Sequence, residues 1–119
     1  MVRLGPPGTF DDSGCTGGCL IEQGGNQHLF YSGWSLAVDV PFTFFIGCAV
    51  SSDGGRTFEK VSPAPVLGRN RIDPYLTASP AILVEGGVWR MWYVSGTGWS
   101  PDAKPEPNYL IRYAESHDG

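Results

Sequence analysis

The sequence repeats itself after 62 residues. Residues 29–31 (Leu-Phe-Tyr) return at 91–93 as Met-Trp-Tyr, and Phe45-Ile46 returns at a spacing of 65 as Leu110-Ile111. The change of spacing means that one loop of the second copy is three residues longer. Because a repeat usually buries its apolar face against its neighbour, we expect two similar units packed together.

The composition favours a single all-β domain over residues 1–119. The chain has 17 Gly and 10 Pro, 13% aromatic residues and only 17% charged residues. Gly and Pro interrupt almost every window in which an amphipathic helix could run. A chain of this length still buries enough surface for a hydrophobic core.

Runs of β-branched and aromatic residues between Gly-rich turns predict two sets of antiparallel strands. Each set has the form of a β-propeller blade, and the fold class is therefore a partial propeller. The first unit covers residues 8–68 and the second covers 69–119. We expect strands at 16–22, 27–33, 42–51 and 57–61, and then at 78–84, 88–95 and 108–116, with turns at the glycine pairs and loops at 34–41 and 96–107.

The second unit lacks the outer strand of the first, and two blades are too few to close a propeller. Unpaired edge strands invite association. The sequence therefore predicts a homo-oligomer, with the free edge covered by Val2–Leu4 or by a partner chain.

Charge and hydropathy argue against two classes of partner. The net charge is −4 and the basic residues are scattered, which disfavours nucleic acid. The apolar run Leu36–Val50 contains Asp39 and Pro41 and is too short to span a bilayer. The first residues lack the apolar segment of a secretion signal, so a cytoplasmic location is expected.

The three cysteines are expected to be free, buried or half-buried thiols. An odd number argues against a complete disulfide framework. Cys15 and Cys19 with His28 do not supply the converging ligand set of a zinc site, so no metal or other cofactor is expected.

Residues Ser51–Phe58 match the pattern S-x-D-x-G-x-T-F at every fixed position. The segment resembles the Asp box of sialidases and related propellers. Its Ser, Asp and Thr side chains can hydrogen-bond within the hairpin while Gly turns the chain. We therefore interpret it as a structural motif, with Ser116-x-Asp118 as the first half of a second one.

Three further segments, Phe10-Asp11-Asp12, Ser79-Pro80 and Trp89–Tyr93, extend the resemblance along nearly the whole chain. With the Asp-box segment they are similar to the first two blades of the five-bladed propeller glycosidases. That clan includes invertases, levansucrases, arabinanases and β-xylosidases.

The resemblance implies catalytic candidates. Asp11 or Asp12 would be the nucleophile or general base. Asp73 would stabilise the transition state, although Ile72 interrupts the Arg-Asp-Pro run of the clan and leaves the role of Arg71 open. The general acid of the clan belongs to a third blade, so whether the chain is an enzyme stays open.

Each candidate has an alternative interpretation. The three Asp residues could cap the turns that precede strands. Trp34 and Trp99 follow Gly in equivalent loops, and Trp34, Arg71 and Trp99 are the expected sugar-binding residues. Trp92 and Tyr93 alternate along a strand, so one of the two is expected in the core.

Two functions follow from these patterns. The first is a carbohydrate-binding, glycosidase-like partial propeller, in which the three Asp residues line a shallow cleft and hydrolysis is at most latent. It would depend on oligomerisation or on further blades. The alternative is a non-catalytic scaffold that self-associates or binds protein through its exposed edge.

Overall fold

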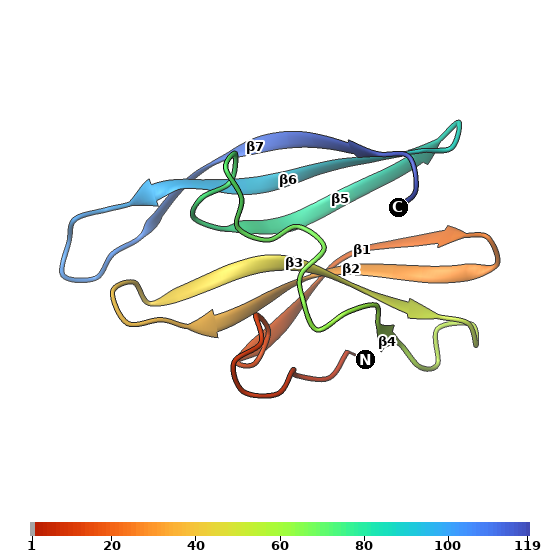
Figure 1. Cartoon of the computed structure of the whole chain (residues 1–119), viewed down its shortest axis with the longest axis horizontal. Helices are drawn as coiled ribbons and strands as arrows, with labels where there is room; N and C mark the ends of the chain where they lie inside the picture. The colour runs from red at the N-terminus through yellow and green to blue at the C-terminus, as the bar shows by residue number, and fades with distance from the viewer. Residues whose placement is uncertain (1) are drawn as a thin grey trace.

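The computed structural model describes residues 2–119, which form two antiparallel β-sheets stacked face to face (Figure 1). Sheet 1 contains β1 (Gly14–Gln23), β2 (Asn26–Leu36), β3 (Phe42–Ser51) and β4 (Glu59–Lys60), in that order. Sheet 2 contains β5 (Thr77–Glu85), β6 (Val88–Trp99) and β7 (Pro107–Ser116). The all-β prediction with sheets of four and three strands is confirmed. Within residues 2–119 no helix is long and apolar enough to cross a membrane.

The repeat is visible in the strand register. Phe30 of β2 lies opposite Cys48 of β3, and the residues equivalent to them, Trp92 and Tyr113, lie opposite each other in β6 and β7. The two first hairpins also match, because each turns through a glycine pair with positive φ, at Gly24-Gly25 and Gly86-Gly87. Only glycine adopts these angles without a steric penalty, which explains why the turns were predictable.

The hairpin between β3 and β4 is closed by side chains. The Ser51 hydroxyl donates to Asp53 over 2.7 Å and accepts from the Gly55 amide over 2.9 Å. Asp53 also accepts from the Thr57 amide over 2.9 Å and from the Thr57 hydroxyl over 2.5 Å. At the end of β7 the first of these contacts recurs, since the Ser116 hydroxyl donates to Asp118 over 2.8 Å.

A β-bulge interrupts the first strand of each sheet at equivalent positions, between Gly17 and Cys19 in β1 and between Ala78 and Ala81 in β5. Inside the second bulge Ser79 has a φ of 52°. Its amide donates to the buried hydroxyl of Ser32 over 2.9 Å, which joins the two sheets. Left-handed φ is strained for serine, and the bond between the sheets helps to hold it.

The hydrophobic core lies between the sheets. Sheet 1 contributes the buried side chains Phe30, Ile46 and Cys48, and sheet 2 contributes Tyr93. Partly buried side chains surround them: Val50, Leu67, Ile82, Trp89, Met91 and Ala114. Burying one large apolar side chain stabilises a fold by roughly 1.5–3 kcal/mol. We call the faces that meet here the inner faces, and the opposite ones the outer faces.

Three sequence expectations need correction. β2 and β6 continue to Leu36 and Trp99, so their ends are strands rather than loops. β4 is only the two-residue strand Glu59–Lys60, because Arg56 to Phe58 follow the closed hairpin instead of pairing with β3. Val2–Leu4 do not pair with β7 but line a hollow beside Leu29 on sheet 1.

Candidate functional site

Asp11 lies in the turn shortly before β1, and its side chain is only 1% exposed. Its carboxylate accepts a hydrogen bond of 2.9 Å from the Tyr31 hydroxyl and an ion-paired bond of 2.5 Å from the Lys60 ammonium. The Thr9 hydroxyl donates to the other carboxylate oxygen over 3.2 Å. Burial, followed by the bond to Asp11, raises the pKa of Tyr31 well above its usual range.

Asp73 lies before β5 and is equally buried, at 1% exposure. Its carboxylate accepts hydrogen bonds from the Tyr93 hydroxyl over 2.8 Å and from the Ser95 hydroxyl over 2.6 Å. The guanidinium Nε of Arg112 lies 3.3 Å from Asp73 Oδ1 as an ion pair, without the angle of a hydrogen bond. Burial and the bond to Asp73 raise the pKa of Tyr93 to about 12.

The two acids are held in the same way. Tyr31 and Tyr93 are equivalent residues, and each follows the acid that it binds by 20 residues. The cations differ, because Lys60 comes from β4 whereas Arg112 comes from β7. A buried carboxylate needs a charge partner and hydrogen-bond donors, and each sheet supplies its own set.

Asp73 lines an open hollow of about 580 Å³ together with Tyr93 and Arg112, and Asp11 is not among the residues that line it. The Asp11 and Asp73 groups have no residue in common, and no hydrogen bond joins them. Both carboxylates already have partners in the residues that the structure describes. These contacts do not assign Asp11 or Asp73 the role of the proton donor that a glycoside leaving group requires.

Asp12 has the geometry of a turn cap. Its carboxylate accepts from the Gly8 amide and from the Ser13 hydroxyl, both over 2.9 Å. The bond from Gly8 is the main cause that lowers the pKa of Asp12. These short-range bonds agree with the turn-capping interpretation.

Aromatic side chains connect the two sheets at the end where the acids lie. Phe42 stands edge-on to Trp99 of sheet 2 and to Phe44, with ring centroids 5.2 Å apart in each case, and Phe44 lies 6.4 Å from Trp34. Trp34 pairs with Gly14 at the start of β1, so this aromatic row is on the same end as Asp11. Both Trp residues are half-buried ends of strands, not loop residues.

Arg71 is exposed and makes no ion pair among the described residues. The cation beside Asp73 is Arg112, which sequence reasoning missed together with Lys60 and the two tyrosines. Tyr31 and Tyr93 could have been found, because the spacing of 62 relates them as it relates Asp11 and Asp73. Nothing in the local sequence marks Lys60 or Arg112.

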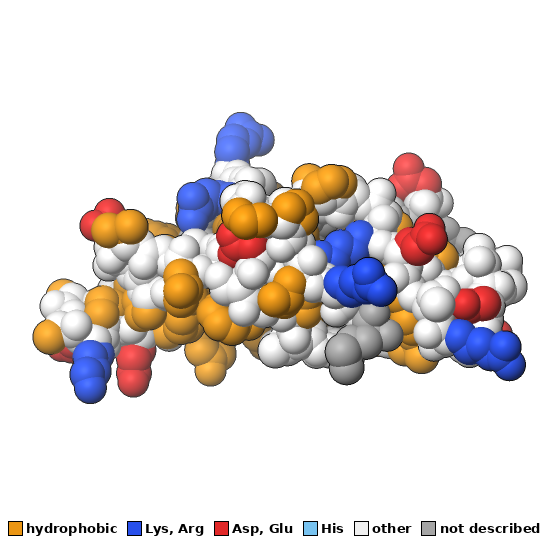
Figure 2. Space-filling view, turned by 90° about the horizontal axis from the view of Figure 1, so that it is seen from below, with side chains coloured by type: hydrophobic (Ala, Val, Ile, Leu, Met, Phe, Trp, Pro, Cys, Tyr) orange, Lys and Arg blue, Asp and Glu red, His pale blue; other side chains and the backbone are white. Residues whose placement is uncertain are grey.

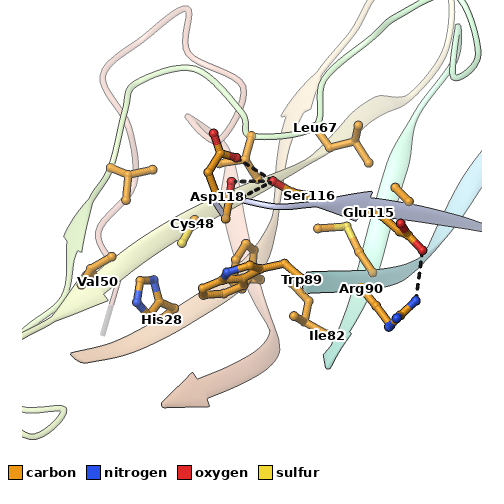
Figure 3. Close-up of a pocket in the computed structure, with 16 residues that line it drawn as sticks. His28, Cys48, Val50, Leu67, Ile82, Trp89, Arg90, Glu115, Ser116 and Asp118 are labelled. Atoms are coloured by element: carbon orange, nitrogen blue, oxygen red, sulfur yellow. Dashed lines mark hydrogen bonds and ion pairs between the residues drawn. The ribbon is translucent and has the colours of Figure 1, made fainter. Parts of the chain in front are cut away.

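A separate apolar pocket of about 470 Å³ lies between the sheets at the opposite end. Figure 3 shows Cys48, Val50, Trp89 and Ile82 around it, with Ser116 and Asp118 at one side. Burial raises the pKa of the Cys48 thiol to about 11, and all three cysteines are free, as the sequence predicts. Neither Asp11 nor Asp73 lines this pocket. In residues 2–119 no three His, Cys, Asp or Glu side chains converge as metal ligands.

The known proteins that resemble this chain in sequence are longer than it is. No family model matches it. It is 40% identical, over all 119 residues, to the uncharacterized proteins MT1551 and Rv1502 of two Mycobacterium tuberculosis strains, CDC 1551 / Oshkosh and ATCC 25618 / H37Rv. The chain spans 39% of the length of each.

A crystal structure of a glycosyl hydrolase from Bacteroides ovatus superposes on 92% of the chain with a TM-score of 0.60. The chain shares the fold of part of that enzyme. The identity is 19%, and 29% of the enzyme is covered, so the likeness concerns the fold alone.

Proposed function

We propose that the chain forms two adjacent blades of a carbohydrate-binding β-propeller of the glycosidase type. The observation that carries the proposal is that Asp11 and Asp73 stand at equivalent heads of the two sheets, at the end crossed by the aromatic row. The similarity in fold to a glycosyl hydrolase supports it.

The chemistry of this end suits a sugar. Carboxylates and tyrosine hydroxyls can exchange hydrogen bonds with sugar hydroxyls, and aromatic faces pack against the apolar faces of sugar rings. Trp34 and Trp99 are half-buried and keep part of their surface open. They are the sugar-stacking residues of the proposal.

Hydrolysis in this chain is proposed to be at most latent. Glycoside cleavage needs a proton donor and a second carboxylate on opposite sides of the bond. Asp11 and Asp73 are acceptors in their own hydrogen-bond groups, which suits positioning or charge stabilisation. The proposal treats Ser51–Phe58 as an Asp box. The role of this segment is to close the hairpin between β3 and β4, not to bind sugar.

Calorimetric titration with arabinan, xylan and fructan oligosaccharides tests binding. We expect at least one to bind, and Trp99→Leu to weaken it about tenfold, the factor that losing one stacked ring represents. Tyr75→Leu is the matched control, since Tyr75 is exposed and outside the aromatic row. Equal affinities for wild type and Trp99→Leu, or no binding by any of the three, contradict the proposal.

Release of nitrophenol from nitrophenyl arabinosides and xylosides measures the catalytic part. Latent hydrolysis predicts a rate near the uncatalysed background. A faster rate that Asp73→Asn abolishes would instead assign Asp73 a direct catalytic role.

A further inference from the structure

The outer face of sheet 2 repeats the pattern that buries the inner face of sheet 1. Trp92, Ile111 and Tyr113 occupy the positions equivalent to Phe30, Ile46 and Cys48. The sheet 1 residues are 6%, 0% and 6% exposed because sheet 2 covers them, whereas the sheet 2 residues are 41%, 65% and 44% exposed.

These exposed residues form an apolar surface that borders a polar group, because Arg90 donates to the Tyr113 hydroxyl over 2.8 Å and to Glu115 over 3.0 Å on the same face. Trp92 and Tyr113 are paired across β6 and β7, with ring centroids 5.2 Å apart. Leu83 on β5 is 47% exposed and pairs with Arg90 beside them. Large clustered apolar surface of this kind marks an interaction site more often than a free surface.

The complement to this surface is present on the same chain. The inner face of sheet 2, which covers sheet 1, presents Ile82, Met91 and Tyr93. The equivalent residues of sheet 1 are Leu20, Leu29 and Tyr31, and they lie on its outer face. Tyr31 is only 1% exposed there, because Phe10 stacks on its ring, so Leu20 and Leu29 form the accessible part. Sheet 1 of another copy therefore offers the residue types that already pack against this pattern within one molecule.

The shape of the outer face of sheet 1 agrees with this pairing. Leu29 and Tyr31 line a hollow of about 1340 Å³, with Val2–Pro6 on one side and Arg56–Lys60 on another. Leu20, in the register position opposite Leu29, is 54% exposed. Figure 2 shows the molecule from this side, with hydrophobic side chains exposed between scattered charges.

We propose that the outer face of sheet 2 binds the outer face of sheet 1 of a second copy, so that chains associate head to tail. The contact repeats between molecules the sheet-on-sheet packing found within one. Because the two surfaces differ, the interface is heterologous, and repeating it gives a ring or an open chain. This interface does not depend on sugar binding.

Light scattering coupled to size-exclusion chromatography tests the proposal over a wide range of concentrations. The wild type is expected to associate. Ile111→Asp places a charge on the outer face of sheet 2, and Leu20→Asp places one on the outer face of sheet 1. Each should raise the dissociation constant at least about thirtyfold, as loss of a central contact does. Both residues are exposed, so the monomers should fold, which circular dichroism checks. Val38→Asp, at a 99% exposed apolar residue in a loop, is the control and should associate as the wild type does.

Mixing the two variants identifies the geometry. The Ile111→Asp chain keeps an intact sheet 1 surface and the Leu20→Asp chain an intact sheet 2 surface, so an equimolar mixture should form a dimer that cannot grow. A monomeric wild type overturns the proposal. So does a Leu20→Asp variant that associates like wild type, which would mean self-pairing of sheet 2, and so does a mixture that stays monomeric.

Discussion

Tyr93 donates a hydrogen bond of 2.8 Å to Asp73, and Tyr31 makes the same bond, of 2.9 Å, to Asp11. The relationship joins the second strand of each sheet to the segment that precedes the first strand. It uses a hydroxyl to satisfy a carboxylate that is 1% exposed. Removing the hydroxyl leaves the acid buried with one donor fewer.

Tyr93→Phe should therefore destabilise the protein by about 1–3 kcal/mol, the usual effect of losing a buried hydrogen bond to a charged group. Tyr31→Phe should cost a similar amount. Urea unfolding followed by circular dichroism measures both. Tyr75→Phe is the control, because Tyr75 is exposed and its hydroxyl makes no hydrogen bond within residues 2–119. A Tyr93 variant as stable as this control would show that the bond contributes nothing.

Gly14→Ala should destabilise the protein by about 1–3 kcal/mol, as overpacking does. A methyl group at Gly14 would lie 1.9 Å from the indole nitrogen of Trp34, so the indole would have to move. Thermal unfolding gives the stability, and tryptophan fluorescence reports on the displaced ring. Gly17→Ala, in the same strand but with nothing within 4 Å, should have a much smaller effect on both. Equal effects of the two changes would contradict the packing described for Trp34.

The β3–β4 hairpin should make stability depend on pH in acid. Bonds from the hydroxyl and amide of Thr57 are the main causes that hold the pKa of Asp53 below its ordinary value of 3.8. A carboxyl group with a lowered pKa stabilises the fold above its unfolded pKa, and this contribution is lost as the pH falls through the folded pKa.

Asp53→Asn should therefore be less stable than wild type at neutral pH, and the difference should shrink as the pH falls below about 4. Urea unfolding at a series of pH values measures it. Asp102→Asn, in the exposed loop between β6 and β7, is the control and should follow the wild-type curve. A pH-independent difference would mean that the charge of Asp53 has no part in closing the hairpin.

Cys48 should react with a thiol reagent far more slowly than Cys15 or Cys19 in the folded protein. Cys48 is 6% exposed, and burial raises its pKa to about 11, so little thiolate forms at neutral pH. Folding favours the neutral thiol, so this contribution is present below about pH 9 and is lost as the pH rises toward 11. Mass spectrometry of peptides after timed labelling distinguishes the three sites. Equal labelling rates would show that the core opens more often than the packing implies.

The sequence predicted the strands because strands and tight turns leave local patterns. Alternation placed either Trp92 or Tyr93 in the core, and the structure buries Tyr93. The partners of the acids left no such pattern, because the Tyr31–Asp11 bond spans 20 residues and the Lys60–Asp11 bond spans 49. Which residue reaches a carboxylate over that distance depends on how the sheet twists and packs. Only the repeat pointed to any of these partners, since it relates Tyr31 to Tyr93 as it relates Asp11 to Asp73.

The order of strands in the two sheets bears on how the protein folds. Every ladder joins strands that are neighbours in sequence, β1 to β4 in one sheet and β5 to β7 in the other. Such local pairings close short loops, which speeds the early steps of folding. Docking of the two sheets needs contacts between residues far apart in the sequence, such as the Ser79–Ser32 bond, which spans 47 residues, and we expect it to limit the folding rate. Each hairpin can therefore form and dissolve many times before the sheets meet.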